Sequence, residues 1–405
     1  MIIKTGAFMA VRKIQKLRKS TLIYSLIIAM ALGALGASVC CRIFEKENTT
    51  YNKPVAATVE PTPEPTPVVT KASLFMVGDA LLHDVIPSAA RVAPGQYDFS
   101  PLLGRVGKIA QPYDLEYYNQ ETILGGDDLG IHGYPRFNGP QAFGDAMVGY
   151  GFNLVSLANN HSLDMDQVGV ENSLAYWKSK TNVVTSGVYE SQAEREAIPV
   201  HEVNGIKYAF FSWTYGMNGL EPPAGKEYQV ACYDGYEDEM VNQIKAAKQK
   251  ADVVIVAMHW GTEYVLEATE EQQRVAQEVA DAGADIIIGN HPHVIGPVQW
   301  LNDHKTICFY ALGNLVAAQF DDSRIEMMAA LNIEKTTFEG KSTIQIKDVK
   351  TDLMYCYGTK DLSYYETVPF SQMSDDTYVA KHAAVYEEYK PYVTALDPTI
   401  QVGGF

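Results

Sequence analysis

Two histidines that flank a proline are the first residues of this sequence that suggest chemistry. His291 and His293 lie in the run GNHPHVIGP, directly after the apolar stretch at 284–288. A proline disfavours the helical region for the residue before it, so His291 is expected to be extended. Residues i and i+2 of an extended segment point to the same face. The pair therefore predicts a metal site at the carboxyl end of a buried strand, although two histidines alone leave a structural role open.

Ligand-type side chains also follow the other apolar runs. The runs cover 73–77, 113–118, 152–158 and 252–258, and the residues after them are Asp79, Glu121, Asn160, His161 and His259. Each has a plain alternative, such as a turn, a helix cap, a solvated acid or a buried histidine. In α/β proteins, however, sites gather outside the carboxyl ends of the strands. Coincidence at five strand ends is the weaker explanation, so we expect these side chains to converge.

Strands and helices alternate along the chain. Continuous apolar runs indicate strands that are buried on both faces. Helical patterns separate them at 101–110, 140–149, 166–178, 235–250 and 269–282, so the sequence predicts an α/β fold. Hairpins are expected at 200–213 and 298–310, and strands at 327–333 and 342–349 precede a helix at 375–390. Hairpins around a parallel core indicate two packed sheets.

The first 41 residues resemble a membrane anchor. Six Lys or Arg residues and no acid occupy the first twenty positions, and 22–41 is an apolar stretch. Twenty helical residues are about 30 Å long, which is the thickness of a hydrocarbon core. A signal peptide is the alternative, but its apolar core is normally only about 7–15 residues. We expect a cytoplasmic basic segment at 1–21, a single transmembrane signal anchor at 22–41, and an extracytoplasmic domain on the cell membrane.

A proline-rich linker is predicted at 42–70. Its centre reads PTPEPTP, which favours extended polyproline II and would act as a semi-rigid spacer; a disordered tail is the alternative. The remaining residues are expected to form a core at 71–320, completed by C-terminal strands and a helix at 321–405.

Charge and cysteine content exclude some classes of function. The formal charge is −17, and the first twenty residues are basic, so the body of the protein is strongly acidic and is not expected to bind nucleic acid. Beyond the apolar stretch the cysteines are Cys232, Cys308 and Cys356, an odd and widely spaced set. They predict neither a disulfide framework nor a thiolate metal site.

Six motifs together resemble a known family. GDALLH, YNQET, SLANNHSLD, AMHWGTEY, GADIIIGNHPHVIGP and ALGNLV occur in the order found in bacterial CapA-type capsule or poly-γ-glutamate synthesis proteins, over Ser73 to Gln319. Those proteins in turn resemble calcineurin-like metallophosphoesterases. The resemblance implies a four-layer α/β/β/α sandwich, and it also implies a membrane polymer synthase as partner and an anionic polymer or phosphoester as substrate.

The resemblance also implies a role for each candidate residue. Asp79 and His293 would bind one divalent ion, and Asn160, His259 and His291 would bind a second. Glu121 would bridge the two ions. His161 would be the catalytic histidine that protonates the leaving oxygen, with Asp79 as the other catalytic residue. Two such ions, Mn, Fe, Zn or Mg, would polarise a phosphoryl oxygen and acidify a water.

The first motif departs from the phosphoesterase pattern. These enzymes have Asp-x-His, whereas Leu81 stands two residues after Asp79, and Glu121 is one methylene longer than the usual aspartate. Two functions therefore stay open: a metal-dependent hydrolase, and a non-catalytic accessory subunit of a polymer synthase. A metal-free polymer-binding protein is a third. Two further residues are ambiguous: Glu263 could line the pocket or orient His259, and Asn314 could simply end a strand.

Overall fold

The computed structural model describes residues 66–405. The predicted basic segment, the transmembrane anchor and most of the proline-rich linker lie outside the described residues. The predicted linker ends too late, because Val68 to Thr70 already belong to strand β1 and pair with residues 335–337 of β14. Between residues 66 and 405, no helix is both long enough and apolar enough to cross a membrane.

The larger of two sheets contains nine strands and carries Asp79. Strands β1, β4, β5 and β6 are parallel, whereas β14, β15 and β16 continue the sheet in antiparallel fashion. Its order is β16 (Tyr365–Pro369), β15 (Lys341–Gly358), β14 (Ile325–Phe338), β1 (Val68–Ala80), β4 (Leu115–Asn119), β5 (Leu154–Ser156) and β6 (Val184–Ser186), with β13 (Asn314–Val316) beside β1 and β17 (Gln401–Val402) beside β15.

The smaller sheet contains six strands and carries His259. Its four central strands are parallel, and β7 and β11 pair with them as the antiparallel arms of two hairpins, which confirms both predicted hairpins. The order is β11 (Val298–Leu301), β12 (Thr306–Phe309), β10 (Ile286–Asn290), β9 (Val253–His259), β8 (Ile206–Thr214) and β7 (His201–Val203).

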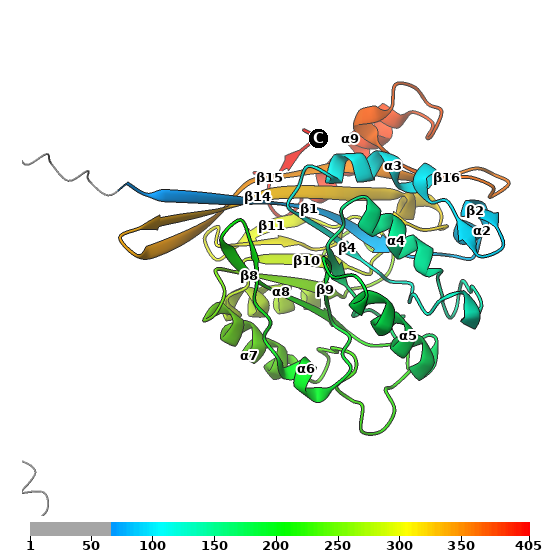
Figure 1. Ribbon diagram of the computed structural model, residues 1–405. Helices are drawn as coiled ribbons and strands as arrows, with labels where there is room; N and C mark the ends of the chain where they lie inside the picture. The colour runs from blue at the N-terminus through cyan, green and yellow to red at the C-terminus, as the bar shows by residue number, and fades with distance from the viewer. Residues whose placement is uncertain (1–65) are drawn as a thin grey trace, which may run out of the picture. The chain divides into compact units, whose positions relative to one another are not determined.

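The two sheets pack face to face with helices outside them. Side chains of both sheets, such as Met76, Phe210 and Ile255, form the central core. A second core lies between the smaller sheet and α7 and α8, and a third lies between the larger sheet and α3 and α4. Figure 1 shows α7 and α8 on the side of the smaller sheet and α3 on the opposite side of the fold. The predicted α/β class with two packed sheets is confirmed.

Most helix boundaries follow the sequence signals closely. The long helices are α3 (Ser100–Ala110), α4 (Gln141–Gly149), α5 (Asp166–Lys178), α7 (Glu237–Lys248), α8 (Glu270–Ala282) and α9 (His382–Val393). Shorter elements are α2 (Val85–Ala90), α6 (Gln192–Glu196), three 3-10 turns at 127–129, 321–324 and 370–372, and the small hairpin of β2 (Arg91–Ala93) and β3 (Gln96–Tyr97). The predicted start of the last helix at 375 is wrong, because Asp376 bonds the backbone of His382 and holds the preceding residues in a turn.

Gly289 allows β10 to lie against the chain after β12, and this contact positions the residues that follow. A Cβ atom at Gly289 would lie 2.0 Å from the carbonyl oxygen of Tyr310. We expect Gly289→Ala to lower the free energy of unfolding by about 3 kcal/mol, the upper part of the range for overpacking. The urea midpoint measures this. Gly216→Ala is the control, because a Cβ there meets nothing within 4 Å, and an equal effect of both changes would contradict the prediction.

Candidate metal centre

The predicted ligands converge at one edge of the fold. Asp79 lies near the end of β1, His259 ends β9, and Asn290 ends β10 directly before His291. Because the parallel strands of both sheets end on this side, residues that are more than 200 positions apart in the chain meet, as the hydrogen bond from the His291 N–H to Asp79 Oδ2 shows. All six predicted ligands are buried: Asp79, Glu121, Asn160, His259, His291 and His293.

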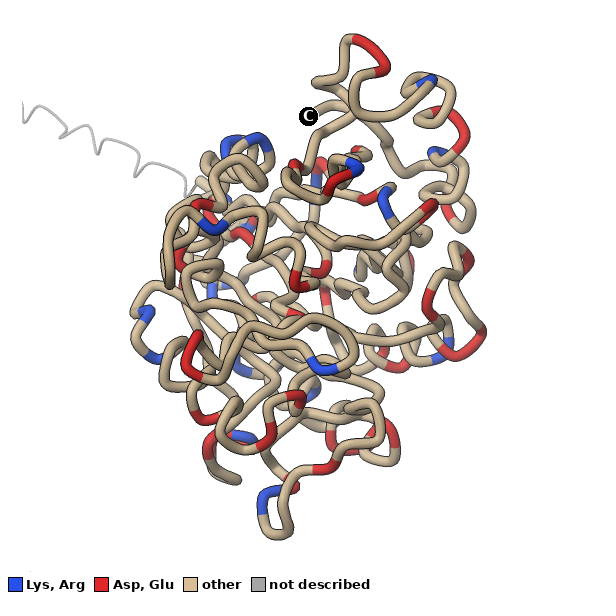
Figure 2. Tube along the Cα trace, turned by 90° about the vertical axis from the view of Figure 1, so that its right-hand side faces the viewer, with Lys and Arg blue, Asp and Glu red and all other residues tan. Residues whose placement is uncertain are grey.

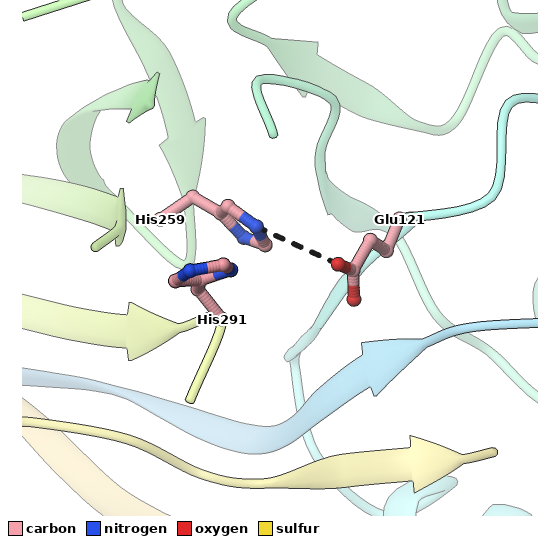
Figure 3. A group of neighbouring side chains, drawn as sticks. All are labelled: Glu121, His259 and His291. Carbon is pink, nitrogen blue, oxygen red and sulfur yellow. Dashed lines mark ion pairs between the residues drawn. The ribbon is translucent and has the colours of Figure 1, made fainter. Parts of the chain in front are cut away.

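Glu121 belongs to two groups of potential ligands. It lies with Asp79 and His293 in one group, called here the Asp79 group, and with His259 and His291 in the other, called the His259 group. Within each group all ligand atoms lie within 4.8 Å of one another. Glu121 Oε1 is 3.6 Å from His259 Nε2 and 3.7 Å from His293 Nε2. Figure 3 shows the Glu121 carboxylate pointing towards the imidazole of His259, with His291 beside it.

Asn160 extends the His259 group. Its Oδ1 lies 2.9 Å from His259 Nε2, and its Nδ2 donates to the side chain of Asn218 at 3.3 Å. The amide oxygen therefore faces the same nitrogen as Glu121 does. The structure thus brings together the two sets of residues that the family resemblance implies for two ions, while their role as ligands stays a prediction.

The donors fit a divalent ion. Three buried atoms of the centre have no hydrogen-bond partner among residues 66–405: both carboxylate oxygens of Glu121 and Nδ1 of His291. Burying an unpaired carboxylate is costly unless a partner or an ion compensates it. Carboxylate, imidazole and amide oxygen suit Mn, Fe, Zn or Mg, and no cysteine belongs to these ligand groups within the described part of the chain. The cluster could hold metal, and its donor set does not distinguish among these ions.

Burial sets the protonation states of the centre. It raises the pKa of Asp79 to about 7 and the pKa of Glu121 well above its ordinary value. It also lowers the pKa of His291 to about 4 and the pKa of His259 and His293 well below the ordinary value. The imidazoles are therefore neutral and able to bind a cation near neutral pH. The carboxyl groups would release protons when a cation binds.

The backbone around Pro292 differs from the prediction. His291 and His293 have φ values of 97° and 57°, so neither is extended. Such left-handed conformations cost roughly 1–3 kcal/mol each and persist only where the surroundings enforce them. Here the His291 N–H donates to Asp79 Oδ2 at 3.0 Å, and Trp260 N–H donates to the Asn290 carbonyl at 3.1 Å. These contacts outweigh the local preference that Pro292 imposes.

Three polar residues that the sequence did not single out support the ligands. Asn119 donates from Nδ2 to Asp79 Oδ1 at 2.7 Å and lies 3.4 Å from His259 Nδ1. Asn290 donates to the hydroxyl of Tyr117 at 2.7 Å. Asp164 accepts from the Phe137 N–H at 2.6 Å and lies beside His161. All three residues lie inside the family motifs, which was the one signal available.

His161 is oriented by Asp164. The Nδ1 atom of His161 is 2.7 Å from Asp164 Oδ2, and its ring packs edge-on against Phe137 at 4.7 Å between centroids. A carboxylate at Nδ1 places the proton there in the neutral ring and leaves Nε2 free. His161 belongs to none of the ligand groups among residues 66–405, which agrees with a role in proton transfer.

A cavity of about 460 Å³ adjoins the centre. Leu81, His161, Glu263 and His293 line it, together with the exposed aromatic residues Tyr134, Tyr264 and Phe320. No Lys or Arg is among its lining residues. Acidic residues are also spread over the whole fold in Figure 2. A larger cavity of about 800 Å³ lies where β9 and β10 begin and contains none of the predicted ligands, so the smaller cavity is the relevant one.

Asn314 does not end a strand but begins β13, and its side chain contacts His293. Its Oδ1 lies 3.0 Å from His293 Nδ1, while its Nδ2 faces the carbonyl oxygens of His293 and Ser323 at 3.3 and 3.2 Å. This amide orientation makes Oδ1 the acceptor, so His293 carries its proton on Nδ1 and leaves Nε2 for a cation.

We expect Asn314→Ala to weaken metal binding by the Asp79 group. Loss of such an orienting partner typically costs about 10–100-fold in affinity. Titration of the protein with Mn²⁺ measures the effect, and Asn332→Ala, which removes a side chain bonded to Asp348 instead, is the control. Unchanged affinity in Asn314→Ala would show that the hydrogen bond to His293 does not matter for binding.

Comparison with known proteins identifies the family. Residues 73–319 match the model of the protein family described as bacterial capsule synthesis protein PGA_cap. The chain is 34% identical over 169 residues to the PGA biosynthesis protein CapA of Bacillus subtilis, which is 42% of this chain and 43% of that protein. It is 33% identical over 174 residues to the capsule biosynthesis protein CapA of Bacillus anthracis, covering 42% and 41%. The chain thus spans less than half the length of these relatives.

One solved structure that is similar is a novel phosphatase of Mycoplasma pneumoniae, with a TM-score of 0.42 and 13% identity over 69% of this chain and 95% of that one. The family match covers more than half of the chain and includes all six predicted ligands. The chain therefore belongs to the bacterial capsule synthesis protein PGA_cap family.

Proposed function

We propose that this chain is a membrane-anchored, extracytoplasmic CapA-type protein of capsule or poly-γ-glutamate biosynthesis, and that it is a divalent-metal-dependent hydrolase with a metallophosphoesterase-like fold. Its substrate would be a phosphoester of the cell envelope. The names of the two Bacillus relatives support the biosynthetic role. The apolar stretch at 22–41 supports the anchor.

One observation carries the hydrolase proposal. Glu121 is shared by two groups of buried potential ligands, and its oxygens have no hydrogen-bond partner among residues 66–405. A purely structural carboxylate at this depth would be expected to be paired. A carboxylate between two ligand groups is instead what a centre of two divalent ions requires.

The residues of the chain divide the chemical tasks. Ions held there would polarise a phosphoryl oxygen and acidify a water. His161 lines the cavity with Nδ1 against Asp164, and the protonated form of its ring would give the proton on Nε2 to the leaving oxygen. No Lys or Arg lines the cavity, so binding of an anionic group depends on the metal centre. The exposed aromatic rim accommodates the remainder of the substrate.

Metal analysis and hydrolysis assays of the purified protein test this function. We expect bound divalent metal and hydrolysis of phosphoesters such as p-nitrophenyl phosphate, with the activity lost on chelation and restored by Mn²⁺. A protein that binds no metal and hydrolyses none of a broad panel of phosphoesters would refute the hydrolase proposal.

A non-catalytic accessory role in a synthase complex is the second candidate. Leu81 favours it, because this buried apolar side chain stands where phosphoesterases have a ligand histidine. The variants Asp79→Ala, His259→Ala and His291→Ala distinguish the two in cells. The hydrolase role predicts that each stops polymer display at normal expression, whereas normal display in all three favours an accessory role without metal.

A further inference from the structure

The Asp79 group has fewer donors than the His259 group. Asp79, Glu121 and His293 form it, whereas the other group combines Glu121, His259 and His291 with Asn160 nearby. Leu81 cannot add a donor, and it is buried with Phe137 and Ala317 in a small apolar cluster. A ligand for the first group must therefore come from another part of the chain.

Glu263 reaches both groups from the loop after β9. Its carboxylate and the ring nitrogens of His291 and His293 lie within 4.8 Å of one another. His291 belongs to the His259 group and His293 to the Asp79 group. Glu263 lines the cavity and is exposed. Its carboxylate is thus placed at the mouth of the centre.

The loop that carries Glu263 is fixed to the histidine segment on both sides. Trp260 N–H donates to the Asn290 carbonyl at 3.1 Å, and Tyr264 N–H donates to the Pro292 carbonyl at 2.7 Å. Trp260 Nε1 also donates to the Tyr310 carbonyl at 2.9 Å. Tyr264 has a φ of 63°, a conformation that a tyrosine adopts only where such contacts enforce it. This strained, doubly anchored loop holds Glu263 beside His291 and His293.

We propose that Glu263 is a metal ligand of this centre and supplies to the Asp79 group the donor that Leu81 does not provide. The inference rests on the proposed metal-dependent function. A carboxylate suits the same Mn, Fe, Zn or Mg ions as the other donors. It arrives from the cavity side, so it also places a negative charge where an anionic substrate would enter.

Mn²⁺ titration of the full 405-residue chain tests the assignment. Calorimetry gives the number of ions bound and their affinities, and electron paramagnetic resonance detects coupling between paired Mn²⁺ ions. Glu263→Gln keeps the size of the side chain but removes its charge. We expect this variant to bind one of the two Mn²⁺ ions with at least tenfold lower affinity and to show no signal from coupled ions. The control is Glu267→Gln, an exposed acid of the same loop, which should behave as wild type.

A second variant asks whether Glu263 replaces the missing histidine. Leu81→His, introduced into the Glu263→Gln protein, restores the usual motif and should recover binding of the weakened ion. Wild-type affinities in Glu263→Gln would overturn the inference while leaving the metal centre intact. A wild-type chain that binds no Mn²⁺ would instead overturn the proposed function and the inference with it.

Discussion

Glu121→Gln should abolish tight metal binding by both ligand groups and with it any hydrolysis. Glu121 is the residue that the Asp79 group and the His259 group share, so its loss removes a charged donor from each. Loss of a residue that only orients a ligand typically lowers metal affinity by about 10–100-fold. Because Glu121 would be a ligand itself, we expect its loss to lower Mn²⁺ affinity by at least about 100-fold. Calorimetric titration of wild type and variant measures this.

The same substitution should stabilise the metal-free protein. Both oxygens of Glu121 are buried without a hydrogen-bond partner among residues 66–405, and an unsatisfied buried group costs roughly 1–3 kcal/mol, more if it is charged. In the presence of a chelator, Glu121→Gln is therefore expected to unfold at a higher urea concentration than wild type. With Mn²⁺ the order reverses, because only wild type gains binding energy.

Glu116→Gln is the matched control, since Glu116 is a buried acid of the neighbouring strand β4 and belongs to no ligand group among the described residues. Burial raises its pKa from 4.5 to about 8. Between these values the folded state binds more protons than the unfolded state, so wild-type stability falls as the pH rises.

Glu116→Gln should therefore stabilise the protein by roughly 1–3 kcal/mol at pH 8 and by less at pH 5, without changing metal affinity. If Glu121→Gln behaved in the same way as this control and still bound two ions, Glu121 would not be a ligand shared by the two groups.

His161→Asn should lower kcat without lowering metal affinity. His161 belongs to neither ligand group, and Asp164 fixes its ring with Nε2 free. General acid catalysis is typically worth about 10²–10⁴-fold. We expect a loss of kcat of this size for phenyl phosphate, whose leaving oxygen needs a proton. The loss should be much smaller for p-nitrophenyl phosphate, because its p-nitrophenolate group leaves readily without a proton.

Steady-state kinetics on both esters, with Mn²⁺ titration beside them, separate the possible roles of His161. An equal loss of kcat on the two esters would argue against proton donation by His161. Binding of one Mn²⁺ ion fewer in the variant would indicate that His161 is a metal ligand. The exposed His132 provides a control, because His132→Asn should leave both rates and both ions unchanged. Asp164→Asn should reproduce part of the His161 effect, since Asp164 orients the His161 ring.

Much of the fold could be predicted because local chemistry dominates there. Continuous apolar runs became the buried strands β9 and β10, and Gly283 ends α8 with a φ of 111° that suits glycine. The predicted helix at 166–178 coincides with α5. The length of β1, β14 and β15 was underestimated, because these strands are extended by pairing with one another over long sequence separations.

The candidate site divides in a similar way. Types and order of the ligands were visible in the sequence, since carboxylates and imidazoles at strand ends have few other reasons to be buried. Asn119 was not singled out and Asn314 was left ambiguous, because the role of an amide depends on which buried group it faces, Asp79 in one case and His293 in the other.

The sequence by itself determined the α/β class, the strand ends that carry polar residues, and the family to which they belong. Only the tertiary structure decided how those residues group. It turned the backbone at His291 and His293 against the preference set by Pro292, placed Glu121 between two sets of donors, and brought Glu263 to the mouth of the centre. The physical reason is that grouping depends on contacts between distant strands and loops, whose combined strength exceeds any local preference of the chain.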